Sequence, residues 1–233
     1  MKTIKITLLV SFIWLLMTNV QGQLLKDIRK IMPAKGNNFT AEEAADGIRE
    51  ALVKGTENTV NIVSSIDGFL GNPEIKIPFP PEAQQIEQKL RAVGLGNKVD
   101  EAVLTMNRAA EEAAKDIQPI FISAIRNMSI SDAINIVNGT DHAATEYLQT
   151  STYDKLFIQI KPVIEKSLET VDATKYWDDL IISYNAIPFV KKMNPDLAEY
   201  VTEKAIQGIF VMLAKEEVKI RKDPKARTTE LLQ

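Results

Sequence analysis

Apolar residues recur every three or four positions through most of the chain, which is the spacing of amphipathic helices. One such stripe runs from Ala45 to Ile66. It follows a capping-box pattern in which Thr40 and Glu43 can each accept the other's backbone amide. Gly55 lies inside this stripe, where the close approach of another helix would explain it. Residues 209–214 are apolar on every side, which predicts a helix at the centre of the core. With no set of period-two strands, no repeat and no linker, the pattern predicts one all-α, bundle-like domain.

A proline-rich stretch interrupts the helical pattern between Gly68 and Pro81. Its four prolines exclude a helix. Ile75, Ile77 and Phe79 alternate with polar residues or proline, so one side of an extended segment is apolar. Such a segment either lies as a strap over helix faces or exposes an edge that recruits another chain. We favour the strap, because exposed apolar edges are normally blunted.

Several other helix ends are marked in the sequence. Asn97, Thr140 and Asn194 each stand where an N-cap is expected, and Asn194 is followed by proline at the first helical position. Pro162 lies inside a helical pattern over residues 153–168, which predicts a kink or break near Ile160.

The first 22 residues have the pattern of a secretory signal peptide. Two lysines precede an apolar run from Ile6 to Met17, and a small residue, Gly22, ends a suitable cleavage site. An uncleaved anchor is the alternative, but the run is shorter than the roughly 20 residues that span a bilayer. We therefore predict cleavage after Gly22. Residues 23–233 are then a single all-helical domain without a transmembrane segment, and its oligomeric state is left open.

Composition and charge exclude several classes of protein. The 233 residues contain no Cys and one His, His142, with 28 Lys and Arg against 31 Asp and Glu. The absence of Cys excludes disulfide scaffolds, thiol enzymes and cysteine-ligated metal sites, and a single His excludes a histidine cluster. A net charge of −3 gives no general attraction to nucleic acid. The sequence therefore predicts no metal, no cofactor and no nucleic-acid partner.

Polar residues on otherwise apolar helix stripes are the candidate site. If they are buried, they must bond to one another, to water or to a ligand. An internal network that joins helices is the favoured explanation, and a ligand site is the alternative. The candidate ligand-binding residues are Asn107, Arg108, Glu111, Tyr147 and Tyr184. None of them forms a recognisable catalytic motif, so no catalytic residue is assigned.

A basic cluster near the C-terminus is the strongest local charge bias. It is a candidate for binding an anionic surface, although nearby acids and the dipole of the helix C-terminus account for much of it. Its residues are Lys219, Arg221, Lys222 and Arg227.

Several motifs together resemble the DUF4197 family over roughly residues 46–232, nearly the whole mature chain. The motifs are Gly68–Pro80, Leu90–Gly96, Met106–Glu111, Lys161–Ile164, Tyr200–Phe210 and Lys219–Leu232. The resemblance implies a bacterial protein with an export signal, and hence the periplasm or envelope of a Gram-negative cell. The family is a domain of unknown function, so it supplies no catalytic residue.

We therefore predict a non-catalytic binding or interaction module for an apolar or amphipathic ligand or an envelope partner. A hydrolase of unrecognised type that uses Asn107, Arg108 and Glu111 is one alternative. A purely structural envelope protein is the other.

Overall fold

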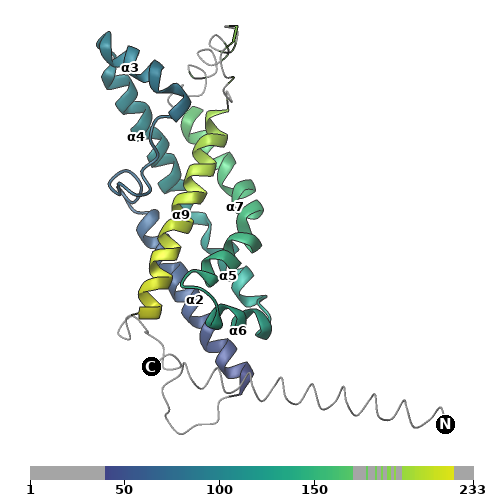
Figure 1. Ribbon diagram of the computed structural model, residues 1–233. Helices are drawn as coiled ribbons and strands as arrows, with labels where there is room; N and C mark the ends of the chain where they lie inside the picture. Colours follow the sequence, from purple (N-terminus) through teal and green to yellow (C-terminus); the bar gives the residue numbers. More distant parts are fainter. Residues whose placement is uncertain are drawn as a thin grey trace, which may run out of the picture.

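Helices form the fold throughout the described part of the chain (Figure 1). The computed structural model describes residues 40–169 and 196–222, together with Trp177, Ile182, Asn185, Pro188, Phe189 and Lys192. These residues contain seven α-helices, two short 3₁₀ turns and no strand, which confirms the all-α prediction. The predicted signal peptide lies outside the described residues, so its cleavage after Gly22 stays a prediction.

Three long helices form the body of the molecule: α2 (Ala41–Val63), α7 (Ala143–Glu169) and α9 (Leu197–Lys222). Helix α9 packs against both α7 and α2, and Figure 1 shows it running along them. Ile206 and Ile209 on α9 are fully buried, and no residue from 209 to 214 is exposed. This position agrees with the central helix predicted from the all-apolar run.

Shorter helices complete the bundle. Helices α5 (Gln118–Arg126) and α6 (Ile130–Asn138) pack against α2 and α7, and α4 (Gly96–Ala113) packs against α7. Helix α3 (Gln84–Ala92) folds back on α4. The 3₁₀ turns η1 (Pro81–Ala83) and η2 (Ala114–Asp116) precede α3 and follow α4. The hairpin of α3 and α4 reaches the end of the molecule opposite to the start of α2 and the end of α9 (Figure 1).

Local sequence signals set some of these helix ends. The amide of Glu43 donates to Thr40 Oγ1 at 3.2 Å, and the amide of Thr40 donates to Glu43 Oε2 at 2.8 Å, so the predicted capping box is confirmed. The prediction for Gly55 is also confirmed, because a Cβ there would lie 3.1 Å from Ile220 Cδ1 on α9. Helices α2 and α9 thus approach closely at Gly55.

Other predicted helix ends were wrong or shifted. Of the predicted kink or break near Ile160, the break is wrong, because α7 continues through Pro162, and the kink stays a prediction. Pro162 and Ile158 both lie on the exposed side of α7. Because proline has no backbone N–H, the carbonyl of Ile158 lacks its helical hydrogen bond. Water can satisfy that carbonyl, while buried side chains on the other side hold the helix together. Helix α4 begins at Gly96, one residue before its predicted cap at Asn97.

Helix α9 begins at Leu197, and the carboxylate before it, Asp196, accepts the amide of Glu199 at 2.8 Å. The predicted cap at Asn194 lies outside the described residues.

The connection, defined as residues 64–80, joins α2 to η1. Turns occupy residues 66–71 and 73–75, and residues 76–80 continue without helix or strand. From residue 74 onward exposure alternates: Ile75 and Ile77 are buried, and Glu74 and Lys76 are exposed. Phe69 is fully buried, so the connection contributes side chains to the core.

Among the helices of the described residues, none combines the length and the apolar composition of a membrane span. Helices α5 and α6 together have a suitable length and composition, but a bend of 104° separates them.

Candidate functional site

Asn107 on α4 pairs with the backbone of the connection. Its side chain is fully buried, and its Oδ1 accepts the amide of Ile77 at 2.9 Å. Its Nδ2 donates to the carbonyl of Ile77 at 2.8 Å and to that of Val103 at 2.7 Å. Asn107 therefore satisfies both the amide and the carbonyl of Ile77, a buried residue that belongs to no helix or sheet.

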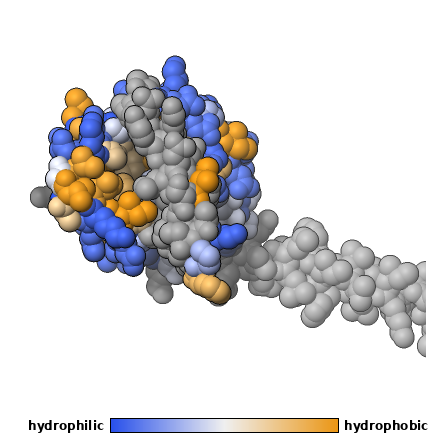
Figure 2. All heavy atoms as spheres, turned by 90° about the horizontal axis from the view of Figure 1, so that it is seen from above, coloured by the Kyte–Doolittle hydropathy of each residue, from blue (hydrophilic) through white to orange (hydrophobic). Residues whose placement is uncertain are grey.

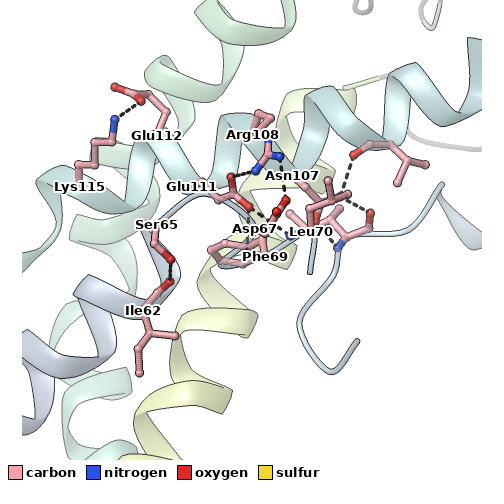
Figure 3. Close-up of polar contacts among 12 residues, drawn as sticks. Ile62, Ser65, Asp67, Phe69, Leu70, Asn107, Arg108, Glu111, Glu112 and Lys115 are labelled. Carbon is pink, nitrogen blue, oxygen red and sulfur yellow. Dashed lines mark hydrogen bonds and ion pairs between the residues drawn. The ribbon is translucent and has the colours of Figure 1, made fainter. Parts of the chain in front are cut away.

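Glu111, one turn further along α4, holds the other end of the connection (Figure 3). Its Oε1 accepts the amides of Phe69 at 3.1 Å and Leu70 at 3.2 Å. Its Oε2 accepts Arg108 Nη1 at 2.6 Å, and Arg108 Nη2 in turn donates to Asp67 Oδ1 at 2.8 Å. The hydrogen bonds to Glu111 and then to Asp67 raise the pKa of Arg108 above its ordinary value.

The structure thus brings together three of the five candidate ligand-binding residues: Asn107, Arg108 and Glu111. Both oxygens of Glu111 are occupied by protein donors, and its side chain is only 5% exposed. A catalytic carboxylate has to reach its substrate, and a ligand here would have to displace the backbone of the connection. The network explains why polar residues stand on an apolar stripe, and ligand binding by these residues stays a prediction.

The two candidate tyrosines are not part of this group. Tyr147, on the second turn of α7, is half-buried and packs on a small cluster that includes Ala133, Ile136 and Ala144. Tyr184 lies outside the described residues.

The basic cluster near the C-terminus is engaged in ion pairs. Lys219 Nζ lies 3.3 Å from Glu216, and Lys222 Nζ lies 3.1 Å from Asp141. Arg221 pairs with Glu217 at 2.7 Å. Arg227 lies outside the described residues, so binding of an anionic surface by this cluster stays a prediction.

Glu217 on α9 closes the N-terminus of α7. Its two oxygens accept the amides of Ala144 and Thr145, each at 2.9 Å, and the Thr145 hydroxyl at 2.8 Å. Arg221 donates to the same carboxylate and also to the carbonyl of Ile136 at 2.8 Å. A helix N-terminus has free N–H groups and a partial positive charge, so a buried carboxylate stabilises it. A void of about 20 Å³ beside Glu217 has room for about one water molecule.

The α3–α4 hairpin differs from the rest of the fold, because α3 contains no buried residue. Gly94 ends α3 with a positive φ of 83°, its amide donating to Arg91 and that of Leu95 to Leu90. This Schellman motif turns the chain directly into α4. At the turn Val93 is 71% exposed and Leu95 is 45% exposed. Figure 2, which looks onto this end of the molecule, shows apolar residues gathered on the side of α3 and α4 among hydrophilic ones.

Basic residues surround this turn. Residues 88–99 contain three basic residues, Lys89, Arg91 and Lys98, and no acidic one. All three are exposed. We name Val93, Leu95 and these three residues the hairpin tip. This turn was not singled out from the sequence, because aliphatic residues beside glycines are ordinary in a turn.

An open depression of about 640 Å³ lies along the outer side of α5. It is lined by Lys115, Asp116, Gln118, Pro119, Ile122, Ser123, Arg126 and Asn127. Among the residues that the structure describes, no three His, Asp or Glu side chains gather as metal ligands.

The fold and its contacts define a multi-helix, all-α protein in which polar side chains of α4 and α9 hold other elements in place. The sequence model of the family described as "Protein of unknown function (DUF4197)" matches residues 38–233, most of the chain. The chain therefore belongs to the DUF4197 family, and the resemblance inferred from its motifs is confirmed. Comparisons with curated proteins and with solved structures give no match.

Proposed function

We propose that this protein is a non-catalytic interaction module of the bacterial envelope that contacts an apolar or amphipathic partner through its α3–α4 hairpin. The observation that carries the proposal is the hairpin tip, where Val93 and Leu95 expose aliphatic side chains at one end of the molecule. Large aliphatic side chains that gather at an exposed turn favour a contact surface over a role in the core.

The buried polar residues support a surface contact over an internal ligand site. The polar atoms of Asn107 and Glu111 bind backbone groups of the connection, so they are used in folding. Large side chains such as Phe69 and Phe121 are buried completely in the same core. No observation on α4 favours the hydrolase alternative, because the carboxylate that it needs is closed off by its protein partners.

Export to the periplasm belongs to the same proposal. It rests on the apolar run at residues 6–17 after two lysines. Protein recovered from the periplasm with Gln23 as its first residue would support export with cleavage after Gly22.

Cell fractionation tests the hairpin as the contact surface. The full-length gene is expressed in a Gram-negative host as wild type, as Val93→Ser/Leu95→Ser and as the control Ile158→Ser. Ile158 on α7 is 73% exposed, close to the 71% of Val93, but lies away from the hairpin. Wild type and control are expected to sediment with the envelope. The double variant should shift to the soluble fraction, with a ratio of bound to free protein at least about tenfold lower.

Circular dichroism and thermal unfolding of the variants check that each still folds. Equal distribution of wild type and the double variant would contradict the proposal. A wild-type protein found entirely in the soluble fraction would do so as well, and would favour a function without an envelope contact.

A further inference from the structure

The shape of the hairpin tip limits what can contact it. Gly94 and Gly96 stand on either side of Leu95, so the turn is narrow and its aliphatic side chains point outward from a convex end. A convex surface cannot enclose a small molecule, because ligand sites are concave. A stable protein interface usually involves about 20–30 residues on each side. Two exposed aliphatic residues on a narrow turn fit insertion into a lipid surface better.

The basic residues of the hairpin tip lie nearer to the turn than the acidic residues that pair with them. Lys89, Arg91 and Lys98 are exposed within a stretch that has no acidic residue. Their acidic neighbours lie further from the turn.

Arg91 pairs with Glu87 at 3.0 Å and with Asp100 at 2.8 Å, and Lys98 pairs with Glu101 at 2.9 Å. The side chains in these ion pairs are partly or largely exposed. Exposed ion pairs are weak and salt-sensitive, so lipid phosphates can compete with the carboxylates for the basic groups.

We infer that the hairpin tip binds the surface of an anionic lipid bilayer, with Val93 and Leu95 entering the headgroup region and the basic residues contacting lipid phosphates. The inference rests on the proposed function and names the partner of the same surface. Aliphatic residues at a turn with basic residues around them combine the two attractions, apolar burial and charge, that interfacial binding uses.

Vesicle sedimentation tests the inference with the protein as recovered from cells. Mass spectrometry first checks that the apolar run at residues 6–17 has been removed, since it would itself bind lipid. Vesicles contain either phosphatidylcholine alone or phosphatidylcholine with 30% phosphatidylglycerol. Wild type and Ile158→Ser are expected to bind the phosphatidylglycerol vesicles equally, and to bind less in 0.5 M salt. Val93→Ser/Leu95→Ser should bind at least about tenfold more weakly.

A second variant, Lys89→Gln/Lys98→Gln, changes exposed residues and leaves the apolar turn intact. Each lost charge should weaken binding about fivefold, and neither charge should matter on pure phosphatidylcholine. The inference is overturned if wild type ignores phosphatidylglycerol vesicles or if the aliphatic and lysine variants bind them as wild type does. If the fractionation test succeeds and vesicle binding fails, the partner is a protein, and only the lipid inference falls. If both fail, the proposed function falls with it.

Discussion

At the scale of single residues, two buried carboxylates accept backbone N–H groups from other parts of the chain. Glu111 accepts two amides of the connection, and Glu217 accepts two amides at the start of α7. Each is also paired with an arginine on its own helix, Arg108 and Arg221 respectively. Such a buried carboxylate and its donors depend on one another. Removal of the carboxylate leaves buried N–H donors unsatisfied, and removal of the arginine leaves a buried charge unpaired.

Replacement of Glu217 tests this arrangement. Glu217→Ala would leave the amides of Ala144 and Thr145 without an acceptor and Arg221 without its ion pair. We expect the free energy of unfolding to fall by about 2–3 kcal/mol, measured by urea denaturation at pH 7. Glu203→Ala, at an exposed position of the same helix, is the control and should change stability by less than about 0.5 kcal/mol. Similar losses in both variants would show that Glu217 is not needed as a cap.

At the scale of elements, α9 meets two neighbours through glycines. A Cβ on Gly208 would lie 2.7 Å from Phe69 Cε1 and 3.1 Å from Ile75 Cβ, both in the connection. On the facing helix α2, a Cβ on Gly55 would lie 3.1 Å from the end of the Ile220 side chain and at an ordinary contact distance of 3.7 Å from Glu216 Cγ. The Phe69 ring is fully buried, whereas Ile220 is half-buried and its terminal methyl can turn away.

The two glycines should therefore respond differently to alanine. In a helix interior, alanine is more favourable than glycine by about 1 kcal/mol, and both variants gain this helix propensity. In Gly208→Ala the overpacking against Phe69 should outweigh this gain, with a net loss of about 1–2 kcal/mol in the free energy of unfolding. Gly55→Ala should leave stability unchanged or raise it by up to about 1 kcal/mol. Thermal and urea unfolding measure both, and Gly208→Ala should lose less in a Phe69→Leu background. A stabilising Gly208→Ala would contradict the packing of the connection on α9.

Elements were predictable where the signal and its partner lie close in the sequence. In the capping box, Thr40 and Glu43 are only three positions apart. The apolar run of α9 predicts burial whichever elements pack around it. The start of α7 was not predictable in this way. Thr140 looked like its cap, but the helix begins at Ala143 and its free amides are satisfied by Glu217, more than 70 residues away in the chain.

At the scale of the whole molecule, the same limit applies to the candidate site. The sequence showed that Asn107 and Glu111 are polar residues on an apolar stripe, but their partners are backbone groups of a segment with no helical pattern. Only the packing of the connection on α4 and α9 assigns those partners. The hairpin tip was overlooked for the opposite reason, because its residues are ordinary in a turn and become notable only once α3 is found to be unburied.

Acid should weaken the whole bundle partly through an ion pair that joins α7 to the start of α9. Lys161 Nζ lies 2.6 Å from Asp196 Oδ2. Partial burial raises the pKa of Asp196, but hydrogen bonds from Lys161 and from the amide of Glu199 outweigh it, so this pKa lies below its ordinary 3.8. The pKa of Lys161 is raised above 10.5, chiefly by the hydrogen bond to Asp196. The contribution of Asp196 is therefore complete above about pH 4 and is lost as the pH falls through its lowered pKa.

Asp196→Asn isolates this charge, because asparagine can still accept the amide of Glu199 as an N-cap. We expect the variant to be less stable than wild type by about 0.5–1 kcal/mol at pH 7, since both partners are partly exposed. The difference should shrink as the pH falls below 4 and the Asp196 carboxylate of wild type becomes protonated at its lowered pKa. Urea unfolding at pH 7, 5 and 3 measures it. In a Lys161→Gln background the same substitution should have a smaller effect at pH 7, since the partner that lowers the pKa of Asp196 is gone. A difference that stays constant from pH 7 to 3 would mean that the charge of Asp196 does not help to hold α7 and α9 together.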